Sequence, residues 1–172
     1  RILGTKPESC YDDITKIAAS TCNVPISLMT LVDKDKQWFK SKVGLEINET
    51  KRDWSFCTHA IQENSPLIIQ DAFQDERFIN NPLVTGDPKI RFYAGFPLKN
   101  RDGNQLGTLC VIDRKPGNLS PKQFNVMELL SKQIVSFLEL RKKLSIPHTL
   151  KELINDESQI KKMSIMAKED PS

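Results

Sequence analysis

The sequence predicts an α+β fold, in which helices pack on a central antiparallel sheet. Helical periodicity marks both ends of the first 144 residues, whereas short apolar runs of strand length lie between them. Two pairs of these runs are separated by turn-forming residues, as in hairpins. The predicted order is helix, hairpin, irregular insert with a short helix, strand, hairpin and long helix.

A first amphipathic helix is predicted over residues 6–22. Thr5 and Glu8 have the spacing of a capping box at its start. Asn23 suits the left-handed position that ends a helix, and Pro25 prevents the helix from continuing.

The first hairpin is predicted from two runs joined by four polar residues. Residues 26–32 are short and apolar, as expected for a strand covered on both faces. In residues 37–43, alternation puts Trp38 and two lysines on one face, and Phe39 and Val43 on the other.

The middle of the chain, residues 45–88, is the least regular part. Residues 55–62 are predicted to form a short helix, and residues 67–70 a short strand. The stretch 71–88 is too long for a simple connection in a compact domain, so we expect it to cover a site.

A second hairpin follows the insert. Residues 91–98 and 105–112 are strand-like, and Asp102 and Gly103 form the type of pair found in tight antiparallel turns.

A long helix is predicted to run from a second capping box, formed by Ser120 and Gln123, to about Leu144. Its apolar surface is broad, and two interpretations stay open: the whole surface packs on the sheet, or part of it forms a dimer seam. We expect one domain over residues 1–144 and a linker or partly helical tail over residues 145–172.

Composition narrows the functional classes. The 172 residues are 38% hydrophobic and 27% charged, which is typical of a soluble globular protein. No apolar run approaches the roughly 18 residues of a spanning helix, and the N-terminus has no export pattern, so we expect no membrane association. The first residue is Arg1 and not Met, which suggests a piece of a longer protein.

Charge and cysteine content point the same way. The net charge of +3 arises from 25 basic and 22 acidic residues that are scattered, so no nucleic-acid partner is expected. The four cysteines contain no C-x-x-C pair and favour a reduced, cytoplasmic location. With only two histidines, a zinc site built on several of them is not expected.

Seven segments carry a more specific signal, in order and with consistent gaps. They are residues 25–33, 37–45, 49–53, 55–61, 81–84, 90–98 and 107–113. Together, over residues 3–144, they resemble a GAF domain of the branch found in bacterial sensor histidine kinases and diguanylate cyclases.

The resemblance implies a sheet of five or six antiparallel strands. The first and last helices would lie on one face, and the irregular insert would close a small-molecule pocket on the other. It also implies a homodimer through those two helices and a covalently attached output domain, a kinase or a cyclase.

Three functions follow from the resemblance. The first is a sensory module, not itself an enzyme, that binds a small molecule and relays its presence through the terminal helices. The alternative is a structural dimerisation module with no ligand. The third is a cysteine-dependent reductase of the free methionine sulfoxide type using Cys57; it is disfavoured, because residues 91–94 lack a cysteine.

The candidate ligand-binding residues are the polar, aromatic and thiol groups expected near the pocket. They are Trp54, Phe56, Cys57, His59, Asp71, Arg91, Tyr93 and Thr108. No catalytic residue and no metal site is assigned, and the ligand and any cofactor are unknown.

Two of these candidates have open alternatives. Cys57 and His59 point about 200° apart on a helix, so they should not form a dyad, although either could face the pocket as a polar contact or as a metal or haem ligand. Arg91 would suit an anionic or planar ligand, or it forms an internal ion pair with Asp53 or Asp71.

Overall fold

The computed structural model describes residues 2, 4–63 and 65–144. It confirms the α+β fold: six antiparallel strands form one sheet in the order β3-β2-β1-β6-β5-β4. The strands are β1 (Ile26–Val32), β2 (Lys36–Val43), β3 (Glu49–Lys51), β4 (Leu67–Ile69), β5 (Phe92–Lys99) and β6 (Gln105–Asp113). The helices are α1 (Ser9–Cys22), α2 (Phe56–Glu63), α3 (Pro82–Thr85) and α4 (Pro121–Leu144), with 3-10 turns η1 (Arg52–Trp54) and η2 (Ala72–Gln74). The predicted tail over residues 145–172 lies outside the described residues.

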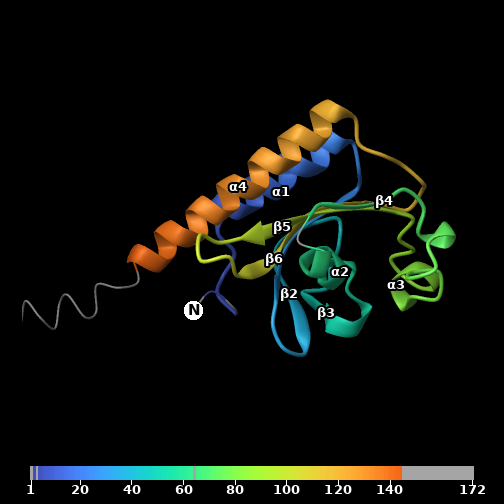
Figure 1. Ribbon diagram of the computed structural model, residues 1–172, viewed down its shortest axis with the longest axis horizontal. Coiled ribbons are helices and arrows are strands. Elements are labelled where there is room, and N and C mark those ends of the chain that lie inside the picture. Colours follow the sequence, from blue (N-terminus) through green and yellow to red (C-terminus); the bar gives the residue numbers. More distant parts are fainter. Residues whose placement is uncertain (1, 3, 64, 145–172) are drawn as a thin grey trace, which may run out of the picture. The chain divides into compact units, whose positions relative to one another are not determined.

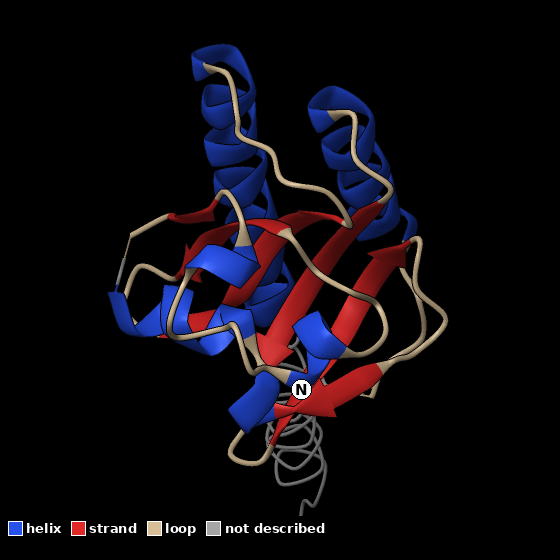
Figure 2. Ribbon diagram, turned by 90° about the vertical axis from the view of Figure 1, so that its right-hand side faces the viewer, coloured by secondary structure: helices blue, strands red, loops and turns tan. Residues whose placement is uncertain are grey.

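Internal contacts divide the chain into two compact units, and the boundary lies after Val135. The sheet and the part of α4 up to Val135 belong to the first unit. Within this unit, α1 and α4 lie on one face of the sheet, and α2 and α3 lie on the other (Figures 1 and 2). Phe124 of α4 packs edge-on against Phe96 of β5, with 5.1 Å between the ring centroids. Met127 and Ile134 of α4 are fully buried.

α1 ends and α4 begins as the sequence predicts, but α1 begins later than predicted. Asn23 has the left-handed conformation (φ 52°), and Ser120 and Gln123 exchange the two hydrogen bonds of a capping box. The predicted capping box at Thr5 and Glu8 is wrong. Lys40 of β2 binds both of these side chains, so neither caps the helix, which starts at Ser9.

The predicted faces of β2 are wrong, because a β-bulge interrupts its pairing with β1. The pairing with β1 shifts register between Met29 and Thr30. As a result, Trp38 and Lys42 lie opposite residues of β1 that face different sides of the sheet, and they do not share a face. Alternation alone could not reveal the extra residue.

The insert is more regular than expected. β3, α3 and both 3-10 turns are short elements that the sequence pattern did not predict. Asn81 begins α3 by accepting a hydrogen bond from the Leu83 amide at 2.9 Å.

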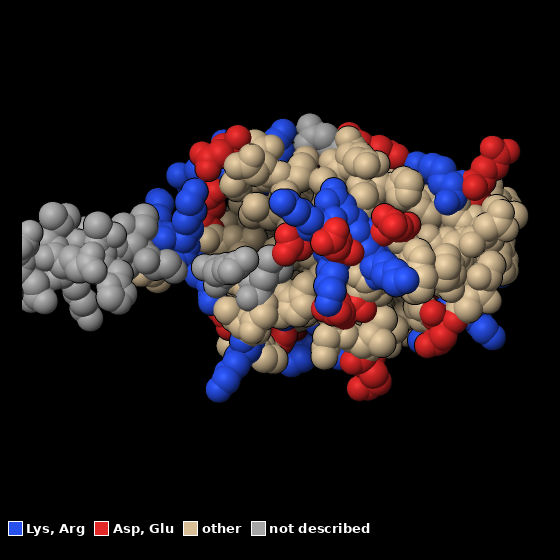
Figure 3. Space-filling view, turned by 90° about the horizontal axis from the view of Figure 1, so that it is seen from below, with Lys and Arg blue, Asp and Glu red and all other residues tan. Residues whose placement is uncertain are grey.

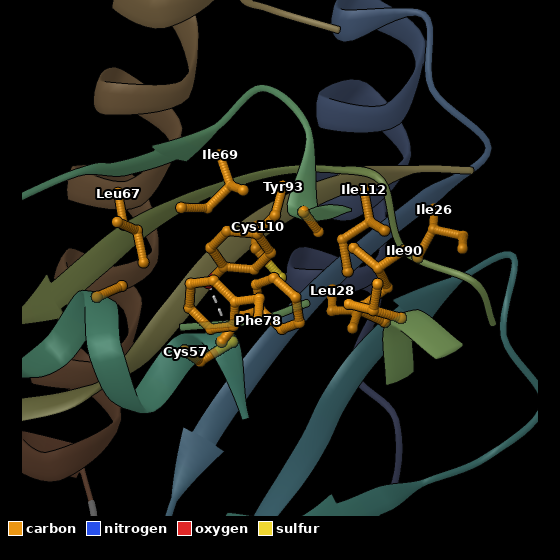
Figure 4. Packing of buried hydrophobic residues seen from close by; sticks show 14 of the residues in the cluster. Ile26, Leu28, Cys57, Leu67, Ile69, Phe78, Ile90, Tyr93, Cys110 and Ile112 are labelled. Carbon is orange, nitrogen blue, oxygen red and sulfur yellow. Dashed lines mark hydrogen bonds between the residues drawn. The ribbon is translucent and has the colours of Figure 1, made fainter. Parts of the chain in front are cut away.

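A hydrophobic cluster fills the space between the sheet and the insert (Figure 4). Strand, α2 and insert residues all contribute to it. Its buried members include Ile26, Leu28, Phe39, Phe56, Cys57, Phe78, Val84, Ile90, Tyr93, Cys110 and Ile112.

Candidate functional site

A cavity of about 30 Å³ lies inside this cluster, between the sheet and the segments that cover it. Its floor is formed by β1, β2 and β6, and its cover by the β2–β3 loop, α2 and the insert. The lining residues are Leu28, Gln37, Phe39, Leu45, Ile47, Thr50, Ser55, Phe56, Cys57, Leu83, Pro88, Ile90, Cys110 and Ile112. The lining is therefore mostly apolar with a few polar groups, as in small-molecule sites, but the free space is close to that of one water molecule.

Cys57 is the centre of the polar part of this site. Its sulfur accepts hydrogen bonds from Gln37 Nε2 and from Tyr93 Oη, both at 3.3 Å. Ser55, which precedes α2, donates in turn to Gln37 Oε1. All four side chains are buried, so this small network forms away from bulk water.

Cys57 and Cys110 both line the cavity, and each thiol affects the ionisation of the other. Burial raises the pKa of Cys57, but hydrogen bonds from Cys110, Thr108 and Tyr93 outweigh it and lower this pKa below its ordinary value. The hydrogen bond to Cys57, together with burial, raises the pKa of Cys110. The two thiols therefore titrate as a coupled pair, in which the Gln37 and Tyr93 donors favour negative charge on Cys57.

Tyr93 reaches Cys57 because Gly95 leaves space for its ring. A Cβ atom at Gly95 would overlap the Tyr93 hydroxyl and would lie 2.6 Å from the ring carbon that bears it. Burial raises the pKa of Tyr93, so its hydroxyl stays protonated and donates.

Aromatic rings flank the network. Phe56 stacks on Phe78 with centroids 4.0 Å apart, and Tyr93 lies 5.1 Å from Phe56. His59 packs edge-on against Phe78 at 4.9 Å. On α2, therefore, Cys57 joins the cavity lining, whereas His59 contacts a different part of the cluster.

The structure brings four of the eight sequence candidates together. Phe56 and Cys57 line the cavity, Tyr93 donates a hydrogen bond to Cys57, and Thr108 helps to lower the pKa of Cys57. Thr108 is also held 3.0 Å from the Thr30 hydroxyl on the neighbouring strand.

The other candidates, like His59, lie away from the cavity lining. Arg91 and Asp71 form a two-fold hydrogen-bonded ion pair, at 2.7 Å for each contact, so the ion-pair alternative holds for Asp71. This pair fixes the start of the insert beside β5, and the Arg91 guanidinium lies 4.3 Å from the Phe73 ring centre. Trp54 is 36% exposed at η1, with Lys51 over its ring.

Sequence reasoning missed several lining residues. Gln37 and Phe39 alternate along β2, and Cys110 and Ile112 alternate along β6. This period of two was a usable signal for both pairs. Thr50 lies on an unpredicted strand, and its buried hydroxyl has no hydrogen-bond partner among the described residues.

Charges of both signs lie next to one another on the face shown in Figure 3. Among the ion pairs of the described residues, Arg77 pairs with both Asp75 and Glu63. Within the described residues, no group of three or more His, Cys, Asp or Glu could hold a metal ion. No helix in the described part of the chain is long and apolar enough to cross a membrane.

The sequence matches a known protein family and a curated relative. The family model described as GAF domain matches residues 6–137. A cyclic di-GMP phosphodiesterase of Pseudomonas aeruginosa is 39% identical over 136 residues, which cover 78% of this chain. The match spans only 23% of that relative's length.

Solved structures show the same fold at low identity. The GAF domain of an Acinetobacter phosphoenolpyruvate-protein phosphotransferase is 17% identical, with a TM-score of 0.62, covering 78% of this chain and 82% of that chain. The free methionine-R-sulfoxide reductase of Neisseria meningitidis, solved with its substrate, is 15% identical with a TM-score of 0.63, covering 77% and 78% of the respective chains.

Proposed function

Because the chain belongs to the GAF domain family, we propose that it is a sensory module that binds a small molecule between sheet and insert and relays its presence to an attached output domain. The observation that carries this proposal is the cavity itself. It is lined mainly by apolar side chains, and a few polar groups converge on it.

The ligand class follows from the lining. No Lys, Arg, Asp or Glu is among the residues that surround the cavity. A small, uncharged and largely apolar ligand therefore fits best, with one polar group near Thr50. Arg91, which would have suited an anion, is already paired with Asp71.

Binding of a ligand much larger than a water molecule requires the cover to move. Leu45 and Ile47 come from the β2–β3 loop, whereas Leu83 and Pro88 come from the insert. Ile47 is 46% exposed, so this side of the cover has little packing to lose. A ligand would separate the two segments, and the sheet would carry the change to α1 and α4.

The output domain is proposed from the curated relative. Identity of 39% to a cyclic di-GMP phosphodiesterase supports an output enzyme of cyclic di-GMP turnover more than a histidine kinase. The four free cysteines support a reducing, cytoplasmic setting. An assay of the full-length protein for cyclic di-GMP hydrolysis tests this part independently of the ligand.

Native mass spectrometry of the protein as purified tests the sensory proposal. We expect a discrete additional mass, which disappears in Thr50→Phe because the new ring fills the cavity from its edge. Lys51→Phe is the matched control, since neighbouring strand residues face opposite sides, and it should keep the ligand. A protein that carries no ligand, and gains no thermal stability from a panel of small apolar compounds, would contradict the proposal.

A structural dimerisation module is the second candidate. Leu129 of α4 and Ile17 of α1 are large apolar residues that are 56% and 49% exposed. Exposed apolar side chains on both terminal helices favour self-association. Light scattering of Leu129→Glu tests this: conversion of a dimer to a monomer supports it, and a monomeric wild type contradicts it.

A further inference from the structure

Two thiols line the cavity. Binding of an apolar ligand does not explain why a pair of thiols lies there. Cys57 comes from α2 and Cys110 from β6, and Figure 4 shows both within the buried cluster. Both line the same 30 Å³ cavity and are at most 2% exposed.

The two thiols are not equivalent. Cys57 receives hydrogen bonds from Tyr93 and Gln37, which stabilise negative charge on its sulfur. Cys110 stays protonated beside it. One sulfur is therefore prepared as a nucleophile, and the other lines the same small cavity, in which the product forms.

We infer that Cys57 and Cys110 form an oxidisable thiol pair, which hydrogen peroxide converts into a disulfide between α2 and β6. Peroxide is selected by size, because the cavity admits a molecule near the size of water but no bulky oxidant. This modification site goes beyond the proposed ligand sensing and does not depend on it.

The reaction balances with peroxide as the only oxidant. The Cys57 thiolate attacks one peroxide oxygen, the O–O bond breaks, and the hydroxide that leaves takes up the proton lost by Cys57 and becomes water. Cys57 is then a sulfenic acid. The Cys110 sulfur attacks the Cys57 sulfur and loses its proton, the S–O bond breaks, and a second water leaves.

The other cysteines provide an internal comparison. Cys22 is also buried, but burial raises its pKa to about 11, so it is an unreactive thiol. Cys10 is partly exposed on α1 and is accessible to large and small oxidants alike. Neither residue lines the cavity.

Peptide mapping of the whole chain tests the inference without any substitution. After peroxide treatment and alkylation, trypsin should yield residues 53–77 cross-linked to residues 102–114, with a mass lower by two hydrogen atoms. Each of the four cysteines falls in a different tryptic peptide, so the linkage is unambiguous. Glutathione disulfide, which is too large for the cavity, should modify Cys10 and leave Cys57 and Cys110 reduced.

Two variants sharpen the test. Cys10→Ser/Cys22→Ser should give the same cross-link at the same rate. Tyr93→Phe should slow its formation about tenfold at neutral pH, with the pH profile shifted upward, because one hydrogen bond to the thiolate is lost. A Cys57 that stays reduced while peroxide oxidises Cys10, or a glutathione adduct on Cys57, would overturn the inference.

Discussion

Lys40 Nζ lies 2.7 Å from the Glu8 carboxylate and joins the segment before α1 to the middle of β2. The Lys40 side chain is fully buried, whereas that of Glu8 is 33% exposed. Lys40 also donates to Thr5 Oγ1 at 2.8 Å and to the carbonyl of Lys6 at 2.6 Å. One ammonium group thus organises the entry into the first helix.

Lys40→Met should lower the free energy of unfolding by about 2–3 kcal/mol, because the variant removes the buried ammonium group that a carboxylate and two further acceptors share. Lys42→Met on the same strand should change it by no more than about 0.5 kcal/mol, since Lys42 donates at the surface. Urea denaturation measures both values. Equal effects at the two positions would show that Lys40 does not organise this segment.

Asp71→Asn should destabilise the domain near neutral pH and progressively less in acid. Hydrogen bonds from Arg91 hold the pKa of Asp71 below its ordinary value of 3.8. A lowered carboxyl pKa stabilises the fold above 3.8, and this contribution is lost as the pH falls through the folded-state pKa. Unfolding midpoints of wild type and variant should therefore converge below that pH, and midpoints that stay apart there would contradict the stabilising role of the Asp71 carboxylate.

Gly95→Ala should act on Tyr93 from two residues away. The added methyl group would displace the Tyr93 ring, at a cost of about 1–3 kcal/mol of overpacking. It should also slow peroxide oxidation of Cys57 as Tyr93→Phe does, because both variants remove the same hydrogen bond. If the Gly95→Ala variant is destabilised but its Cys57 reacts at the wild-type rate, the displaced ring does not affect the thiol, and this expectation is wrong.

Two threonine variants should shift stability in opposite directions. Thr50→Val removes a buried hydroxyl that has no partner in the described part of the chain, and it should raise the free energy of unfolding by about 1 kcal/mol. Thr30→Val breaks the buried hydroxyl pair with Thr108 and should lower it by about 1 kcal/mol. Thermal and urea unfolding of both variants check the signs; a destabilised Thr50→Val would mean that its hydroxyl is satisfied in solution.

Local signals in the sequence were sufficient for most of the fold. The stop at Asn23, the capping box at Ser120 and the turn between β5 and β6 each depend on neighbouring residues. The start of α1 could not be predicted in this way, because Lys40 competes for Thr5 and Glu8 from far along the chain. The start of α1 is therefore set by a tertiary contact with Lys40, and not by the local capping-box pattern.

The site was predictable only in part, for the same reason. Phe56 and Cys57 could be assigned to the covering helix, and Tyr93 to a strand beneath it. The partnership of Cys57 with Cys110 depends on how α2 is placed over β6, which no local pattern contains. Arg91 is paired with Asp71, which precedes it by 20 residues. Gln37 joins the site by donating to Cys57, which follows it by 20 residues. No local pattern contains either contact.

β6 is a partition between two compartments. Cys110 and Ile112 face the cavity. Leu109 and Val111, both fully buried, alternate with them and therefore face the opposite side of the sheet, on which α1 and α4 lie (Figure 1). Each side chain of β6 lies on one face of the sheet. A structural change in the cavity therefore has to shift the backbone of β6 before it can alter the packing of the helices. The amide hydrogens of β6, hydrogen-bonded to β1 on one side and β5 on the other, are therefore the natural reporters of communication across the domain.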